Sequence, residues 1–111
     1  MYQTIIDGVT YGTVDVKEDN QTLPSEFVLY QNYPNPFNPT TNIEYFLPNS
    51  TKVTLRIYNI LGEEVRRLIE EYQQRGKHKI IFNARSLPSG VYICNLVCDN
   101  KVTSMKIILS K

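Results

Sequence analysis

Enzyme chemistry in this chain of 111 residues would depend on its single histidine, His78, together with carboxylates and serines. His78, Ile80 and Phe82 are spaced two residues apart, which predicts that they share one face of a strand. We therefore expect His78 to be a partly buried histidine rather than a general base. Two pairs of carboxylates are adjacent in the sequence, Glu63-Glu64 and Glu70-Glu71. Adjacent strand residues point to opposite faces, so neither pair is expected to share a proton. We therefore predict no catalytic residue.

The two cysteines, Cys94 and Cys98, are also expected to form no disulfide and to take no part in catalysis. On one extended strand their Cα atoms would lie about 13 Å apart at about 3.3 Å per residue. A disulfide needs a separation of about 7 Å or less. We predict free thiols that act as small buried hydrophobic side chains. A zinc site would need ligands beyond these and His78, so no metal and no cofactor are expected.

Composition and charge argue against several classes of function. The net charge is +1 with acidic and basic residues interleaved, so the chain lacks the electrostatic footprint of a nucleic-acid-binding protein. Its apolar runs fall far short of the roughly 18 residues of a membrane-spanning helix, and its first residues do not resemble a signal peptide. Eight tyrosines without a tryptophan make a carbohydrate-binding module a weak alternative.

From Phe27 onward, short β-type runs are separated by turn signals at intervals of roughly eight to twelve residues, which predicts a β-sandwich. The clearest run alternates Val53, Leu55 and Ile57 with polar residues, as expected of a half-buried strand. Gly90 is interpreted as a turn glycine. The seven expected strands are 28–31, 42–47, 52–58, 64–72, 77–83, 91–98 and 101–109.

The run 64–72 is ambiguous between strand and helix. Its apolar residues are Val65, Leu68, Ile69 and Tyr72. Their spacing of i, i+3, i+4 and i+7 locally favours an amphipathic helix. A seven-stranded sandwich nevertheless needs a strand here, and a turn leads directly into the next run. We expect a strand with a β-bulge near Arg66-Arg67 that returns Leu68 to the face of Val65.

The N-terminal quarter of the chain differs from the rest. Residues 1–16 predict a hairpin around Asp7-Gly8, a favoured two-residue turn. Residues 17–26 are polar, contain a proline and show no periodicity, as is typical of a linker. We expect residues 1–16 to be the tail of a preceding region or an added ribbon, and residues 27–111 to form the main domain.

The densest signal is Gln31–Thr41, which holds three prolines and three asparagines in eleven residues. Each proline fixes φ, removes a backbone donor and keeps the preceding residue out of the α region. The segment is therefore a stiff, shaped loop, and the rings of Tyr33 and Phe37 are able to pin it to a core. Such a loop is a rigid corner, a binding surface, or both.

In their order along the chain, these signals resemble one family. The resemblance rests on Leu29–Thr41, Ile43-Glu44-Tyr45 with Leu47-Pro48, Val53–Asn59 with Leu61-Gly62, Leu87–Tyr92, and Lys106–Lys111. Over residues 27–111, the chain is similar to the type A C-terminal sorting domain of the type IX secretion system. Cys94 and Cys98 depart from the aromatic or aliphatic residues expected in their strand.

This resemblance implies an immunoglobulin-like, seven-stranded antiparallel β-sandwich, here with an extra N-terminal hairpin or extension. The domain would be a non-catalytic secretion signal that directs an exported protein through the outer-membrane translocon to the cell surface or medium. The implied partners are the type IX translocon and its shuttle proteins, a sortase-like cysteine peptidase, and a covalently linked N-terminal cargo domain. The positions expected in translocon recognition are Pro34, Asn35, Pro36, Phe37, Asn38, Pro39, Leu61, Gly62, Gly90, Lys106 and Lys111.

The main alternative is a structural immunoglobulin-like accessory or spacer domain of a secreted multidomain enzyme, comparable to the immunoglobulin-like part of flagellar hook-capping proteins. One fold serves many functions, so fold alone does not separate the two. A sorting domain must end its protein, whereas a spacer can occupy any position. The terminal strand 101–109 and the N-terminal hairpin are also expected to pair with the translocon or with a second copy, giving a homodimer.

Overall fold

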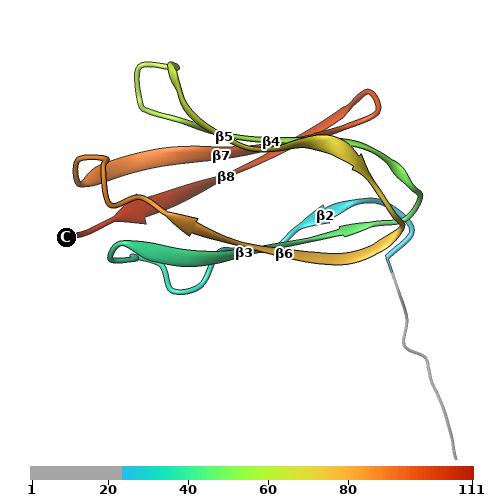
Figure 1. The fold of residues 1–111 in the computed structure, drawn as a ribbon, viewed down its shortest axis with the longest axis horizontal. Helices are drawn as coiled ribbons and strands as arrows, with labels where there is room; N and C mark the ends of the chain where they lie inside the picture. The colour runs from blue at the N-terminus through green and yellow to red at the C-terminus, as the bar shows by residue number, and fades with distance from the viewer. Residues whose placement is uncertain (1–23) are drawn as a thin grey trace, which may run out of the picture.

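The chain folds into two antiparallel sheets packed face to face, in a computed structural model that describes residues 24–111 (Figure 1). The strands are β2 (Val28–Leu29), β3 (Thr40–Leu47), β4 (Thr51–Tyr58), β5 (Glu64–Gln73), β6 (Gly76–Asn83), β7 (Gly90–Cys98) and β8 (Lys101–Leu109). One sheet has the order β2-β3-β6 and the other β5-β4-β7-β8. The prediction of a seven-stranded all-β sandwich is confirmed. The hairpin expected in 1–16 and most of the linker expected in 17–26 lie outside the described residues.

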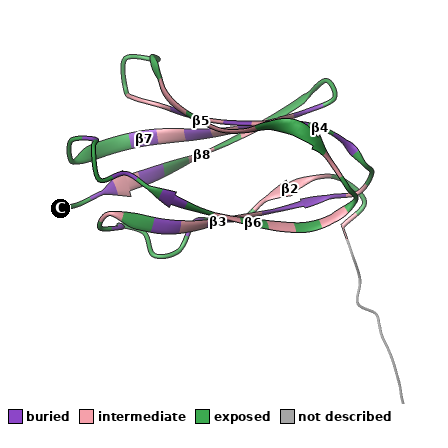
Figure 2. Ribbon diagram, viewed as in Figure 1, coloured by how far each residue is buried: buried purple, intermediate pink, exposed green. Residues whose placement is uncertain are grey.

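Alternation along the strands builds the core between the sheets (Figure 2). In β4 the odd-numbered residues are buried, and in β7 the even-numbered residues from Tyr92 onward are buried. Fully burying one large apolar side chain is worth about 1.5–3 kcal/mol, so this core is the main source of stability. Its members are Phe37, Ile43, Tyr45, Leu47, Val53, Leu55, Ile57, Phe82, Ala84, Leu87, Tyr92, Cys94, Leu96, Cys98, Ile107 and Leu109.

Strand β5 shows why its sequence imitates a helix. Its register with β4 shifts twice, so that Leu68 and Val65 are each an extra residue without a partner in β4. Both side chains still pack against the core. An inserted residue lengthens the local repeat from two to three, which produces a helix-like spacing on an extended strand. The expected strand is confirmed, and bulges flank the Arg66-Arg67 pair. Tyr72 instead pairs with Lys52 and is 68% exposed.

The two ends of the sandwich carry different segments. What we call the motif end comprises residues 30–39, 59–63, 84–89 and 110–111, and it lies on the left of Figure 1. The junction end comprises the turns 48–50, 74–75 and 99–100 together with residues 24–27, where the described chain begins. The ion pair between Glu26 and Lys101, at 4.0 Å, holds this beginning beside the β7–β8 turn.

Candidate functional site at the motif end

The proline-asparagine loop, residues 30–39, crosses from one sheet to the other. Tyr33 forms an antiparallel bridge with Asn42 of β3, and Phe37 forms a parallel bridge with Leu109 of β8. The Phe37 N–H donates to the carbonyl oxygen of Ile108, and the Ser110 N–H donates to the carbonyl oxygen of Phe37, both at 2.9 Å. The loop therefore joins the first strands of the domain to its last one.

The side chain of Phe37 anchors this crossing. It is only 1% exposed, and its ring centroid lies 5.9 Å from that of Phe82 in a tilted arrangement. The sequence-based interpretation that an aromatic ring pins the loop to the core is confirmed for Phe37 and wrong for Tyr33, whose side chain is 77% exposed. Tyr33 takes part through its backbone instead.

Side-chain amides and hydroxyls satisfy the backbone groups that the prolines leave unpaired. The side-chain oxygen of Asn35 accepts a hydrogen bond from the Ile108 N–H at 3.0 Å. Inside the loop, the Pro34 carbonyl accepts from the Asn32 amide at 3.2 Å and from the Thr41 hydroxyl at 2.8 Å. Asn32 and Thr41 are almost fully buried, and the sequence reasoning missed their role. Thr41 shares the inward alternation of Ile43, which is the signal that could have revealed it.

The outer surface of the loop is open to solvent. Pro34, Asn35, Pro36 and Asn38 are exposed, whereas Pro39 is half-buried. Pro39 also accepts a hydrogen bond, from the Ala84 N–H to its carbonyl at 2.9 Å. A ridge of ring and amide groups on fixed backbone is a surface that a partner is able to recognise by shape.

The terminal lysines lie beside this loop. Lys106, on β8, has its carbonyl 3.4 Å from the side-chain amide of Gln31, which donates to it. The Lys111 ammonium donates to the Arg85 carbonyl at 2.6 Å, and the Lys111 N–H donates to the Ser89 hydroxyl at 3.1 Å. Both lysines are exposed. The last residues are thus tied to the segment that precedes Gly90.

The β4–β5 turn, residues 59–63, presents two apolar side chains on a well-bonded backbone. The Asn59 side-chain oxygen accepts from the Leu61 and Glu63 N–H groups at 2.9 and 3.0 Å. Gly62 adopts a φ of 82°, a left-handed conformation that glycine takes at little cost. Ile60 and Leu61 are 77% and 79% exposed. The turn therefore holds an apolar pair in solvent with little freedom of its own.

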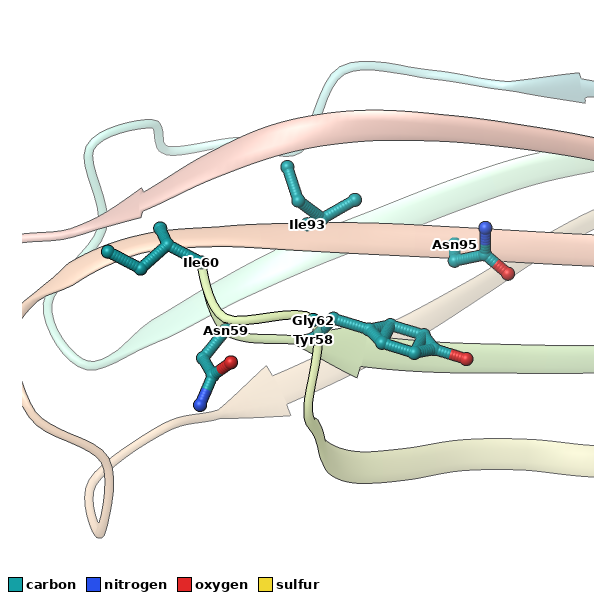
Figure 3. Close-up of a pocket in the computed structure, with 6 residues that line it drawn as sticks. All are labelled: Tyr58, Asn59, Ile60, Gly62, Ile93 and Asn95. Carbon is teal, nitrogen blue, oxygen red and sulfur yellow. The ribbon is translucent and has the colours of Figure 1, made fainter.

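A hollow of about 450 Å³ lies beneath Ile60 on the outer face of the four-stranded sheet (Figure 3). Its lining comes from the turn and from the facing strands: Tyr58, Asn59, Ile60, Gly62, Ile93 and Asn95. A second hollow of about 190 Å³ also borders Ile60, and its wall includes Gly90 and Tyr92. The Leu61-Gly62 turn and the Gly90 segment are therefore neighbours, although they are far apart in sequence.

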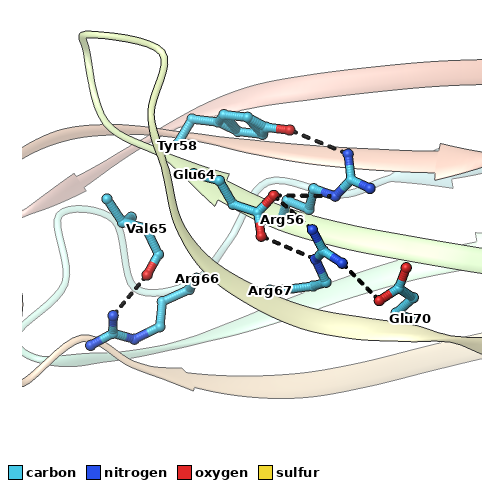
Figure 4. Close-up of polar contacts among 7 residues, drawn as sticks. All are labelled: Arg56, Tyr58, Glu64, Val65, Arg66, Arg67 and Glu70. Carbon is cyan, nitrogen blue, oxygen red and sulfur yellow. Dashed lines mark hydrogen bonds and ion pairs between the residues drawn. The ribbon is translucent and has the colours of Figure 1, made fainter.

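Four charged side chains near the turn, two arginines and two glutamates, form ion pairs with one another (Figure 4). The Arg67 guanidinium contacts Glu64 at 3.0 Å and Glu70 at 2.9 Å, and Arg56 lies 3.6 Å from Glu64. The hydrogen bonds from Arg67 lower the pKa of both Glu64 and Glu70. These carboxylates stay ionised and paired, so no unpaired acid of this cluster is available for proton transfer.

The residues first considered for chemistry are placed as the sequence predicted. Cys94 and Cys98 are free and buried, and burial raises the pKa of the two thiols to about 12 and about 11. His78 is half-buried, stacks on Tyr45 and bonds the Gln74 carbonyl at 2.7 Å. Within residues 24–111, no three His, Cys, Asp or Glu residues are grouped to hold a metal ion. In the same part of the chain, no helix has the length and apolarity needed to cross a membrane.

The comparison with known families covers most of the chain. Residues 31–110 match the model of a family described as the secretion system C-terminal sorting domain. The match includes residues 31–39 of the loop, the β4–β5 turn, the Gly90 segment and the whole of β8. No curated protein matches the chain closely enough to count as a relative. On the strength of the family match and the all-β sandwich, the chain belongs to the family of type IX secretion system C-terminal sorting domains.

Proposed function

We propose that the motif end is the surface by which this sorting signal binds the type IX translocon and its shuttle proteins, while the cargo is joined at the junction end. One observation carries the proposal. The loop, the Leu61-Gly62 turn, Gly90 and Lys111 gather at one end of the sandwich, and the described chain begins at the other. A receptor bound at the motif end would be separated from the cargo by the length of the sheets, about 30 Å for nine residues.

The chemistry of this surface suits recognition by shape and apolar contact. Ile60 and Leu61 are large apolar residues held in solvent by a bonded turn. Interfaces draw most of their affinity from a few such anchors, and anchors that are already ordered lose little entropy on binding. The exposed prolines of the loop add a second rigid contact. The Phe37 side chain contributes indirectly, because it is buried and holds the loop in place.

The remaining partners follow from the same arrangement. A sortase-like cysteine peptidase would cut in residues 17–26, between the cargo and the domain. The Glu26 side chain, at the end of this segment, is 74% exposed, and proteases prefer exposed segments. Cutting there would leave the sandwich intact and deliver the cargo to the cell surface or the medium. In this reading the domain itself is not an enzyme.

An export assay tests the proposal. Residues 17–111 are fused to a neutral periplasmic reporter in a host that has the type IX machinery, and appearance of the reporter outside the cell is measured. We expect export of the fusion. Retention in the periplasm would overturn the sorting function and favour the spacer alternative.

A matched pair of variants locates the receptor surface. Leu61→Ser changes the motif end, and Tyr72→Ser changes a comparably exposed side chain toward the junction end of β5. Exposed substitutions of this kind change stability by about 0.5 kcal/mol or less, so both variants should fold. We expect Leu61→Ser to reduce export and Tyr72→Ser to leave it unchanged. Equal export of the two would refute the motif-end surface without refuting the sorting function.

We also propose that β8 pairs with β8 of a second copy, and the hydrogen bonds of the loop limit which residues of β8 are able to do so. The loop already bonds the outward backbone groups of Ile108 and Ser110, and Gln31 bonds that of Lys106. The same alternation leaves the outward groups of Val102 and Ser104 for a partner strand. A homodimer through β8 would therefore use its first half, and light scattering that shows a strict monomer at high concentration would refute it.

A further inference from the structure

Among the strands of residues 24–111, β6 (Gly76–Asn83) forms an open edge on the flank of the sandwich opposite the loop. It pairs with β3, and no other described strand lies on its far side in the three-stranded sheet. Just beyond the two strands, the Ala84 N–H donates to the carbonyl of Pro39, the residue before β3. Because backbone groups alternate in direction along a strand, the even-numbered residues of β6 form the backbone hydrogen bonds with β3. The odd-numbered residues, Lys77, Lys79, Ile81 and Asn83, direct their backbone N–H and C=O groups toward the open flank.

The other sheet edges of the described residues are irregular, short or partly covered. β5 carries two register shifts, β2 has only two residues, and the last part of β8 is covered by the loop. β6 pairs with β3 through eight consecutive residue pairs without a shift, and it contains no proline. A long regular edge is a template for strand addition. In residues 24–111, β6 is the edge best suited to that role.

The side chains beside this edge define what would fit. On the outer face, Lys77 and Lys79 are exposed, and Ile81 is 65% exposed. On the inner face, a groove of about 270 Å³ between the sheets is lined by the apolar side chains of Leu68, Ile69 and Ile80 and by polar or charged residues that include Glu70, Glu71 and Gln73. The side chains of Leu68 and Ile80 are only partly buried against the core. If a partner strand paired with β6, its side chains would point alternately toward the lysines on the outer face and toward this groove on the inner face.

We propose that the β6 edge accepts a strand from a partner protein in which acidic side chains alternate with apolar ones. The acidic side chains would lie opposite Lys77 and Lys79 on the outer face, and the apolar ones would pack against Leu68 and Ile80 at the apolar part of the groove. A second copy is a poor occupant, because antiparallel pairing of two β6 strands brings lysines of the same charge together. This site is on the flank of the sandwich and is independent of the proposed receptor surface at the motif end.

Peptide binding to the full chain tests the site. The probe is a fluorescently labelled eight-residue peptide that alternates glutamate with valine, and the control peptide replaces each glutamate with lysine. Binding is followed by fluorescence anisotropy and by amide shifts of the ¹⁵N-labelled chain. We expect the acidic peptide to shift and protect the amides of Lys79 and Ile81, and the basic peptide to bind more weakly. Shifts confined to β8, or no shift at millimolar peptide, would overturn the proposal.

Two variants separate charge from backbone pairing. Lys77→Glu with Lys79→Glu should weaken the acidic peptide about tenfold and strengthen the basic one, since each exposed charge pair is worth a few-fold in affinity. Lys79→Pro removes an outward N–H that β3 does not use, so it should block the new pairing while an edge strand tolerates it. Undiminished binding to a folded Lys79→Pro variant would refute strand addition. These readouts do not depend on export, so their failure is distinct from failure of the sorting proposal.

Discussion

Replacing Phe37 with alanine should remove the anchor that holds the proline-asparagine loop to the terminal strand. The ring is 1% exposed and packs near Phe82, and Phe→Ala changes at such sites cost about 3–5 kcal/mol. The 88 described residues (111 less the first 23) would have a free energy of unfolding of roughly 4–13 kcal/mol at 0.05–0.15 kcal/mol per residue. The variant is therefore expected to lose about a quarter or more of its stability.

Urea unfolding of the full chain, followed by far-UV circular dichroism at 25 °C, measures this loss. Tyr33→Ala is the matched control, because Tyr33 belongs to the same loop and is 77% exposed. Its free energy of unfolding should change by about 0.5 kcal/mol or less. Hydrogen exchange at the Ile108 amide, which bonds Asn35, should accelerate in the Phe37 variant and not in the control.

A double-mutant cycle with Leu109→Ala examines the link to β8 directly. Phe37 and Leu109 form a bridge and belong to the same core cluster, so their effects should be coupled by about 0.5–3 kcal/mol. The reasoning fails if Phe37→Ala costs less than about 1 kcal/mol, if the Tyr33 control costs as much, or if the two core substitutions are additive.

Three further predictions concern the turn, the thiols and alkaline pH. Asn59→Ala should lower the free energy of unfolding by about 1–2 kcal/mol, because two backbone N–H groups lose their acceptor; an unchanged urea midpoint would contradict this. Cys94 and Cys98 are buried with raised pKa values, so they should react with a thiol reagent at least about 100-fold more slowly in buffer than in denaturant, and equal rates would show that the core is open. Burial raises the pKa of Tyr45 to about 12 from 10.0. The folded state therefore holds this proton more tightly, and on the order of 2 kcal/mol of stability, complete below pH 10, should be lost as the pH rises toward 12. Tyr45→Phe should reduce that pH dependence, and an identical dependence in the variant would refute the assignment.

The regular strands were predictable because their side chains alternate between a buried and a solvent face. β4 and β7 follow this rule closely, and local pattern was enough to identify them. β5 was harder, because the bulges at Val65 and Leu68 change its period. Only the need for a strand between two turns corrected the helical interpretation. A local pattern carries no information about inserted residues until the partner strand is known.

The candidate site was predictable only in part for a related reason. The stiffness of the loop and the burial of Phe37 follow from nearby residues. The partner of the loop, residues 108–110, lies some 70 positions away, and nothing near Phe37 indicates it. The roles of Asn32 and Thr41 as hydrogen-bond donors to the Pro34 carbonyl were missed for the same reason. Hydrogen bonds of this kind depend on which backbone groups the fold leaves unpaired.

The bond between the loop and β8 also sets an order of events during synthesis. Residues 32–37 leave the ribosome early, but their partners Ile108 and Ser110 are made some 70 residues later. On a nascent chain that stops short of the last strand, the loop lacks the hydrogen bonds that hold it to β8. A receptor that recognises the loop in its bonded form would therefore favour chains that contain the last strand over truncated ones.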